Sequence, residues 1–372
     1  MKKIIFFLFT TAVAIPALFA QIPLTTAPSG GNKKASVSEQ IGLTQVTIHY
    51  DRPGVKGREG KIWGALVPVG FTDPGFGSSK SSPWRAGANQ NTTIEFSTGV
   101  KIEGQPLPAG KYGFFIAYGD KESTLIFSTN TTSWGHYYYN EKEDALRVKV
   151  KPVSLNESVE WLKYEFMNET ANSAVVALEW EKLKIPFTIE VDFINDQLAS
   201  FRSELRNSNG FMWESWNLAA SWCVQNNVNL EEALLWADSA TSVNFGGDNS
   251  FRAWSTKAQV LEKLGRGNDA METMKKAYPL ASVSELHQYG RQLLAQKKNK
   301  EAFDVFKTNF DKHPNEFTTL VGLARGYSAI GDYKKALKFA TQALPLATDQ
   351  INKTSVEGMI QKLKDGKDGN QQ

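Results

Sequence analysis

Two short segments in the first half of the sequence concentrate side chains that could bind a polar or anionic ligand. They cover residues 49–58 and 84–89. Arginine offers a planar fork of donors to carboxylates and phosphates, tryptophan offers a face for stacking, and asparagine offers an amide. His49 and Asp51 are two residues apart, so on a strand they share a face and could work as an acid and base pair. The candidate ligand-binding residues are therefore His49, Asp51, Arg52, Arg58, Trp84, Arg85 and Asn89.

A structural role for these residues stays open. Asp51 and Arg52 could fix the turn at Arg-Pro-Gly, and Arg85 could pair with a carboxylate such as Glu95. The two interpretations make different demands on geometry. A binding site requires that Arg58 and Arg85 lie around one cleft, whereas placement on opposite sides of the domain would exclude it.

A further group of candidates lies in the aromatic segment 133–140, which reads Ser-Trp-Gly-His-Tyr-Tyr-Tyr-Asn. Trp134 and His136 could stack on a sugar or fill a pocket of a partner. The same aromatic residues could instead cover one end of a β-structure. Both interpretations stay open at this point.

Known catalytic motifs are missing from the sequence. It contains no His-Glu-x-x-His, no Gly-x-Ser-x-Gly and no paired Cys-x-x-Cys. One cysteine and four histidines allow neither a disulfide framework nor a cysteine-rich metal site. We therefore expect no catalytic residue, no metal and no cofactor, although whether the protein is an enzyme is left undecided.

The secondary structure that must position these candidates differs between the two halves of the chain. The 372 residues are enough for two domains, and 42 Lys and Arg against 39 Asp and Glu give a formal charge of +3. So small a charge provides no broad basic field, and we expect no nucleic-acid partner.

Residues 35–194 are expected to form an all-β antiparallel sandwich. Their apolar residues alternate or come in short runs rich in β-branched and aromatic types, separated by turn residues. No helical pattern intervenes, which favours a sandwich over an α/β fold. Strands are predicted at 44–50, 92–96, 111–117, 124–128, 146–151, 159–167, 174–180 and 187–192.

Residues 195–364 have helical spacing and an internal repeat of roughly 34 residues. Four alanines that each open a second helix mark the repeat: Ala233, Ala270, Ala302 and Ala336. The segment 214–350 resembles the tetratricopeptide repeat, which implies an all-α superhelix of stacked hairpins; we expect four units, a capping helix at 355–364 and a polar tail at 365–372.

Three residues occupy equivalent positions in successive repeats: Gln259, Arg291 and Arg325. By the resemblance, this position faces the concave groove. Two adjacent arginines there would suit an acidic segment or a chain terminus of a partner. A solvated helix face is an equally consistent interpretation.

The β half also resembles a known family. The segments Ala-Ser-Val-Ser-Glu-Gln-Ile-Gly at 35–42, Tyr-Asp-Arg-Pro-Gly-Val-Lys-Gly-Arg at 50–58 and Pro-Trp-Arg-Ala-Gly-Ala-Asn at 83–89 are similar to the bacterial domain of unknown function 2911. Further similar segments extend the resemblance over about residues 35–190. It implies a compact β domain in exported proteins, mostly of Bacteroidetes-like bacteria, and it implies no established activity.

The first twenty residues have the layout of a secretory signal peptide. Two lysines precede an apolar run that ends at Ala20, and a linker is expected over 21–34. No cysteine follows the run, so a lipid anchor is not expected. We therefore expect an exported chain, periplasmic or extracellular, with no transmembrane segment once residues 1–20 are removed.

These observations together predict an exported, non-enzymatic interaction or scaffold protein. Its helical repeats would bind an unidentified protein or peptide, and its β domain would hold a small polar or anionic ligand. The alternative interpretation makes the β domain a small-molecule binder or hydrolase with the repeats as an accessory.

Overall fold

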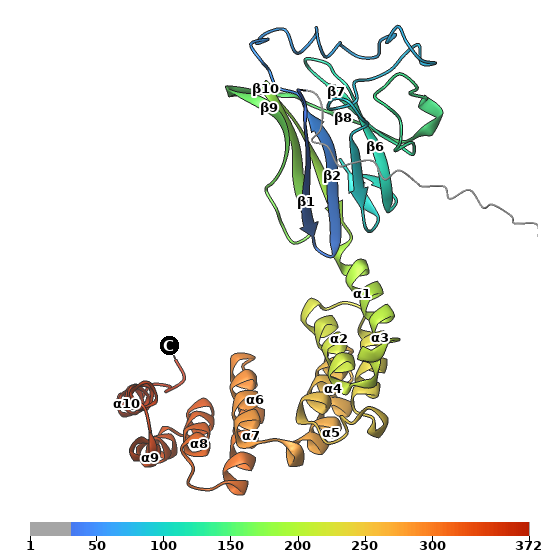
Figure 1. Cartoon of the computed structure of the whole chain (residues 1–372). Coiled ribbons are helices and arrows are strands. Elements are labelled where there is room, and N and C mark those ends of the chain that lie inside the picture. The colour runs from blue at the N-terminus through green and yellow to red at the C-terminus, as the bar shows by residue number, and fades with distance from the viewer. Residues whose placement is uncertain (1–30, 372) are drawn as a thin grey trace, which may run out of the picture. The chain divides into compact units, whose positions relative to one another are not determined.

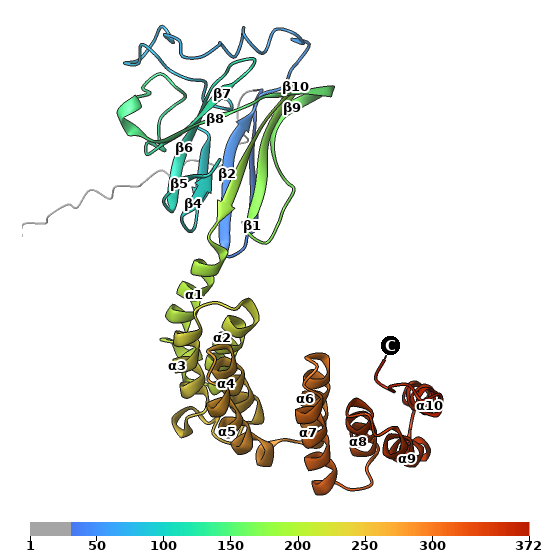
Figure 2. The same ribbon diagram turned by 180° about the vertical axis from the view of Figure 1, so that it is seen from behind.

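The computed structural model describes residues 31–371, so the signal peptide predicted at 1–20 lies outside the described residues. The chain divides into two compact units between Gln197 and Leu198 (Figures 1 and 2). The first unit is built of strands and the second of helices, which confirms the predicted fold class. No helix within residues 31–371 combines the length and the hydrophobicity that a membrane span requires.

The β unit consists of two antiparallel sheets. The six-stranded sheet has the order β1-β2-β3-β6-β7-β8, and the four-stranded sheet has the order β5-β4-β10-β9. The strands are β1 (Lys33–Ile41), β2 (Thr44–Arg52), β3 (Thr93–Phe96), β4 (Val100–Ile102), β5 (Gln105–Leu107), β6 (Gly110–Ala117), β7 (Ser123–Ser128), β8 (Asp144–Val150), β9 (Val153–Met167) and β10 (Ser173–Val191).

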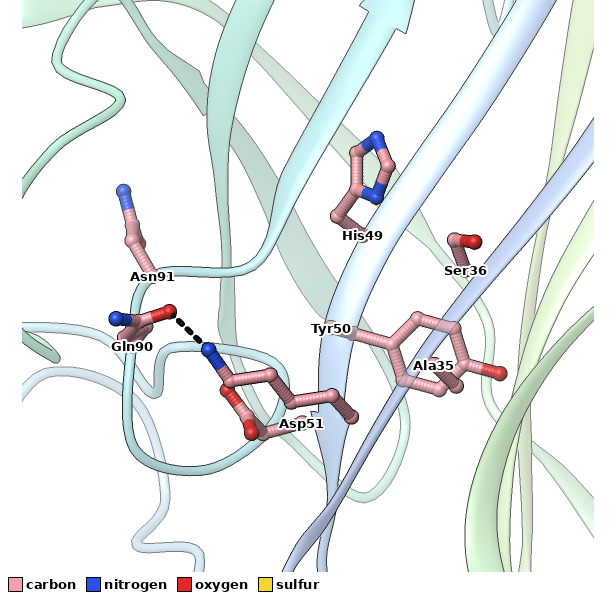
Figure 3. A pocket seen from close by; sticks show the side chains of 8 residues that line it. Ala35, Ser36, His49, Tyr50, Asp51, Gln90 and Asn91 are labelled. Atoms are coloured by element: carbon pink, nitrogen blue, oxygen red, sulfur yellow. Dashed lines mark hydrogen bonds between the residues drawn. The ribbon is translucent and has the colours of Figure 1, made fainter. Parts of the chain in front are cut away.

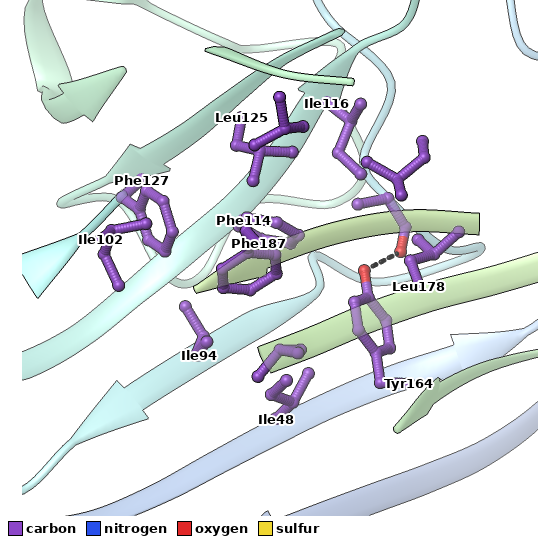
Figure 4. Close-up of a cluster of buried hydrophobic side chains, with 14 of the residues drawn as sticks. Ile48, Ile94, Ile102, Phe114, Ile116, Leu125, Phe127, Tyr164, Leu178 and Phe187 are labelled. Atoms are coloured by element: carbon purple, nitrogen blue, oxygen red, sulfur yellow. Dashed lines mark hydrogen bonds between the residues drawn. The ribbon is translucent and has the colours of Figure 1, made fainter. Parts of the chain in front are cut away.

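The hydrophobic core of this unit fills the space between the two sheets (Figure 4). Ile48 of β2 and Phe114 of β6 enter it from one side, and Phe187 of β10 enters from the other. The rings of Phe114 and Phe187 have their centroids 5.6 Å apart. Because side chains alternate along a strand, burial of Ile48 directs His49 and Asp51 to the outer face of the six-stranded sheet.

The sheets differ from the predicted strands in several places, and the short strands β4 and β5 were not predicted. The strands expected at 174–180 and 187–192 are one strand, β10, whose register with β9 shifts on either side of Glu181. Glu181 adopts a positive φ of 52°, so the extra residue of a bulge breaks the alternation without ending the strand. The edge strand β1 was not predicted, and its ladder with β2 begins at Lys33, within the segment expected to be a linker.

The helical unit is a series of paired antiparallel helices. After α1, the pairs are α2 with α3, α4 with α5, α6 with α7, and α8 with α9, and α10 packs on α9. The four predicted repeats are thereby present. The helices are α1 (Phe193–Glu204), α2 (Trp213–Asn226), α3 (Leu230–Ala240), α4 (Phe251–Lys263), α5 (Gly267–Ala277), α6 (Val283–Ala295), α7 (Asn299–Lys312), α8 (Phe317–Ala329), α9 (Tyr333–Ala343) and α10 (Gln350–Lys364).

Small residues allow the paired helices to approach closely. The four marker alanines all lie near the start of a second helix, where they are buried. Gly290 of α6 faces the ring of Phe306 of α7, and a Cβ atom on Gly290 would come within 2.5 Å of that ring. The pattern of small residues in the sequence therefore reports the sites of closest helix packing.

Candidate functional site

Outward-facing side chains of β1 and β2 line a shallow hollow on the six-stranded sheet (Figure 3). The register pairs Lys34 with Asp51 and Ser36 with His49. The loop before β3 closes one side, where Lys34 Nζ donates a hydrogen bond of 2.9 Å to Gln90 Oε1. The hollow has a volume of about 530 Å³. Its lining includes the positively charged Lys34 and the negatively charged Asp51, and so offers both donors and acceptors.

Asp51 connects this hollow to the second predicted segment. Its side chain is buried, and Oδ1 accepts a hydrogen bond of 3.3 Å from Asn89 Nδ2. Asn89 adopts a positive φ of 51°, which turns its backbone carbonyl toward the guanidinium of Arg85. Arg85 Nη1 donates to this carbonyl at 2.8 Å. The structure thus brings Asp51, Asn89 and Arg85 together, on the same sheet face as His49.

Arg52 and Arg58 donate hydrogen bonds to backbone carbonyl groups and do not line a cleft. Arg52 Nε donates to the carbonyl of Leu162 on β9 at 2.8 Å, and so joins the two sheets. Arg58 Nη2 and Nε donate to the carbonyls of Gly54 and Val55 at 2.7 and 3.0 Å. Neither arginine lines the hollow beside Asp51. These contacts are structural, but they differ from the ones expected from the sequence, because Arg58 rather than Arg52 holds the turn and Arg85 binds the carbonyl of Asn89 rather than Glu95.

Trp84 is a core residue. Its side chain is 7% exposed, and its Nε1 donates to the carbonyl of Gly87 at 3.1 Å. The ring stacks on Trp180 with centroids 6.1 Å apart, and Trp63 meets it edge-on at 5.7 Å. A ring enclosed in this way cannot present a face to a ligand.

The aromatic segment 133–140 contains both exposed and covered residues. Trp134 is 57% exposed, whereas Tyr139 is buried against Phe115. Burial, assisted by the charge of Arg85, lowers the pKa of His136 to about 4, so its imidazole is neutral at neutral pH. The segment therefore covers the outer face of the sheet and also leaves one tryptophan in solvent.

In the helical unit, Arg291 of α6 and Arg325 of α8 lie close enough for their positive charges to repel each other. Burial lowers the pKa of Arg325, and the charge of Arg291 lowers it further. Burial also lowers the pKa of His287 to about 4, again assisted by both arginines. We call these three residues the arginine face; they come from two helices that pack side by side.

The arginine face contains polar atoms without partners. Arg325 Nε and His287 Nδ1 are both buried, and neither has a hydrogen-bond partner in the structure. No carboxylate of the described residues forms an ion pair with Arg291 or Arg325. Because buried polar groups are almost always satisfied, these two atoms are exceptions at the contact between α6 and α8.

Gln259 lies apart from the arginine face. Its Nε2 donates to Ser255 Oγ of the same helix, α4, at 3.4 Å. It lines two cavities near α4 and α6, and one of about 570 Å³ is bordered by Met271, Met274 and Tyr289. That cavity lies between the second and third hairpins, which one hydrophobic cluster joins through contacts such as that of Phe251 with Tyr289.

Sequence reasoning missed a set of residues in the segment after α10. This segment, 366–371, was expected to be only a polar tail. Instead, Asn370 Nδ2 donates to the carbonyl of Arg325 at 3.0 Å, and Arg325 Nη1 reaches Asn370 Oδ1 at 3.4 Å. Ser328 Oγ donates to Asp368 Oδ1 at 2.6 Å. One sequence signal could have pointed to this segment: Arg325 occupies the repeat position equivalent to that of Arg291.

Metal binding has no support from the described residues. Within residues 31–371, no group of three or more His, Cys, Asp or Glu side chains is arranged to hold an ion. What the two candidate sites offer is hydrogen bonding and charge. The hollow suits a small polar molecule, and the arginine face suits carboxylates or a peptide backbone.

Comparisons with solved structures find helical repeat proteins. A TPR protein called YrrB, described as having an unusual peptide-binding site, is 15% identical over 45% of this chain and 86% of its own, with a TM-score of 0.28. MamA from Desulfovibrio magneticus RS-1 is 18% identical over 43% and 88%, with a TM-score of 0.29. Pseudomonas aeruginosa pilF is 19% identical over 42% and 69%, with a TM-score of 0.30.

Comparisons with family models address both units. No curated protein matches the chain. Residues 32–189 match the family described as "Protein of unknown function (DUF2911)", and residues 286–349 match a tetratricopeptide repeat. Both resemblances expected from the sequence are thereby confirmed. An N-terminal β unit that is similar to DUF2911 thus precedes a helical unit that is similar, in its last part, to tetratricopeptide repeats.

Proposed function

We propose that this protein is an exported, non-enzymatic scaffold whose arginine face binds an extended acidic segment of a partner protein. The observation that carries the proposal is the pair of neighbouring guanidinium groups of Arg291 and Arg325, neither of which forms an ion pair with a carboxylate of the described residues. A carboxylate of the partner would neutralise the guanidinium groups, and its backbone would supply both donors and acceptors.

The chemistry of the arginine face favours a peptide over a small anion. Arg325 Nε requires an acceptor. His287 is neutral at neutral pH, so Nδ1 can accept a hydrogen bond or donate one, according to the tautomer. An extended peptide offers carbonyl and N–H groups in alternation, whereas phosphate and sulfate offer mainly acceptors. Repeat arrays of this type also build surfaces long enough for a peptide.

The binding experiment uses a fluorescent synthetic peptide of alternating Asp and Gly and the full chain. We expect Arg291→Ala to weaken binding by about tenfold, as for the loss of one charge-assisted contact. Lys334→Ala, which removes the same charge from the outside of α9, is the matched control and should leave the affinity unchanged. Equal affinities for the Arg291→Ala variant and the unmodified protein would contradict the proposal.

Export is supported by the layout of residues 1–20, with two lysines, an apolar run and a small residue. Expression in a Gram-negative host and N-terminal sequencing test this part of the proposal. We expect the protein in the periplasmic fraction or the medium, beginning close to residue 21. Recovery from the cytosol with residues 1–20 intact would contradict it.

A second candidate function concerns the hollow on the β unit. Its specific support is the buried carboxylate of Asp51, held by Asn89 beside Lys34 and His49. We infer a small polar ligand that carries both donors and acceptors. Citrate and glucosamine at millimolar concentration are suitable probes, because binding to the native state raises its melting temperature. The rise should disappear in Lys34→Ala and persist in Lys101→Ala, which alters an exposed lysine of β4.

A further inference from the structure

We propose that the segment 366–371 is an internal ligand that occupies the α8 side of the arginine face, at Arg325, and competes there with partners. The inference rests on the proposed function, and it specifies the chemistry of the partner. The displacing segment carries a carboxylate, then a residue with little or no side chain, then an amide, as Asp368, Gly369 and Asn370 do.

The segment is held through specific polar contacts with α8. Ser328 Oγ donates to Asp368 Oδ1 at 2.6 Å and accepts from the amide of Gly369 at 2.8 Å. Asn370 uses both ends of its amide on Arg325, with the backbone carbonyl at 3.0 Å and the guanidinium at 3.4 Å. Ser328 thus recognises both the carboxylate of Asp368 and the backbone of Gly369, and Arg325 recognises the amide of Asn370.

Gly369 explains why the middle position must be small. It is buried, and a Cβ atom there would come within 2.7 Å of Met359 and 3.4 Å of Leu363, both on α10. The same position contacts Ser328 on α8, so the backbone lies between two helices. A larger residue would move the backbone away from Ser328 and break that contact.

The internal segment satisfies only part of the face, and this makes it displaceable. It reaches Arg325 but leaves Arg325 Nε without a partner, and no contact joins it to Arg291 on α6. The charge of Asp368 does act on Arg325, where it opposes the lowering of the pKa. A longer segment that binds α8 and also Arg291 therefore gains contacts that the internal one lacks.

The internal segment nevertheless competes with a longer partner, because it is covalently attached beside the face. It follows α10 directly, so its local concentration at the face is high without strong contacts. A partner binds only to the fraction of molecules in which the segment is released, and its apparent affinity falls by that fraction. The segment therefore lowers the apparent affinity of every partner, and acidic peptides that bind weakly do not displace it.

The test uses a fluorescent peptide with the sequence Lys-Asp-Gly-Lys-Asp-Gly-Asn-Gln of residues 364–371 and measures anisotropy with full-length proteins. The double variant Asp368→Ala/Asn370→Ala should bind the peptide about tenfold more tightly than the unmodified protein. Lys367→Ala changes an exposed residue of the same segment and should bind like the unmodified protein. A chain ending at Lys364 is a second way to release the face and should match the double variant, with far-UV circular dichroism to verify folding.

The results separate this inference from the proposed function. Equal binding by the unmodified protein and the double variant, or no binding to either protein or to the shortened chain, overturns the internal ligand. The Asp-Gly peptide and the Arg291→Ala variant report independently on the proposed function. If Arg291→Ala still weakens Asp-Gly binding while the double variant changes nothing, the internal ligand alone is wrong.

Discussion

Ser328 Oγ donates a hydrogen bond of 2.6 Å to Asp368 Oδ1 and accepts one of 2.8 Å from the amide of Gly369. One hydroxyl group of α8 therefore holds two consecutive residues of the segment that follows α10. The side chain of Ser328 is only 2% exposed, so water competes little for these bonds. Ser328 is therefore one of the main contacts that hold this segment on α8.

Ser328→Ala should release the segment. The substitution removes both hydrogen bonds and leaves the carboxylate of Asp368 without its donor from α8, at a cost of about 1–2 kcal/mol. The measurement is hydrogen exchange of the Gly369 amide, which should lose its protection. Ser355→Ala, which alters an exposed serine on α10, is the control and should leave the exchange unchanged. Retained protection in Ser328→Ala would show that the segment is held in another way.

Gly290→Ala should destabilise the helical unit. The new methyl group would lie 2.5 Å from the ring of Phe306, inside a packed core, so helix α6 must move or Phe306 must leave its position. Overpacking of this kind costs about 1–3 kcal/mol. Urea denaturation followed by far-UV circular dichroism measures the free energy of unfolding.

Gly358→Ala, in contrast, should stabilise the helical unit. Gly358 lies in the middle of α10, and no atom comes within 4 Å of a Cβ atom built there. Alanine has the higher helix propensity, so this variant should gain about 0.5–1 kcal/mol. If Gly290→Ala does not destabilise the unit, the packing of α6 on α7 differs from the one described, whereas a destabilised Gly358→Ala variant would mean that this position of α10 is not open.

The sequence predicted the fold well where a physical period was strong. The repeat was visible because each hairpin needs a small residue such as Ala302 or Gly290 at its closest approach. Strand β1 escaped prediction because it is an edge strand with polar outward residues, and only Ala35, Val37 and Ile41 face the core. The continuity of β10 past Glu181 is set by its ladder with β9, which local alternation does not encode.

The candidate site was less predictable because residue types do not specify backbone geometry. Arg52 and Arg58 have the chemistry of ligand donors, yet nearby carbonyl groups accept their hydrogen bonds. Asp51 and Asn89 meet because a loop with a left-handed residue returns to β2. The docking of Asn370 on Arg325 depends on the turn after α10, and glycine-rich polar residues there are equally typical of a free tail.

Acidification should destabilise the helical unit through His287. Its folded pKa is about 4, well below the ordinary value of 6.5, because burial and two nearby arginines oppose the charged form. Between these two values the unfolded chain binds more protons than the folded chain. The free energy of unfolding should therefore fall as the pH decreases from 7 toward 4, and urea denaturation at several pH values measures this slope.

His287→Gln should reduce that slope whatever it does to stability at pH 7, because glutamine cannot take up a proton. His136 acts in the same direction in the β unit, so the unmodified protein is the necessary reference. His313→Gln changes a more exposed imidazole near the end of α7 and is the control. A slope identical in His287→Gln and the unmodified protein would mean that the imidazole of His287 is accessible to water.

Two tryptophans that share a sequence-based prediction should respond oppositely to substitution. Trp84 is 7% exposed and stacks on Trp180, so Trp84→Ala should leave a cavity and cost about 3–5 kcal/mol. Trp134 is 57% exposed, and Trp134→Ala should change the free energy of unfolding by less than about 0.5 kcal/mol. Thermal denaturation of both variants measures the difference. A large loss in Trp134→Ala would place its ring in the interior. A stable Trp84→Ala variant would show that the cluster of Trp63, Trp84 and Trp180 is not part of the core, and would return Trp84 to the residues free to contact a ligand.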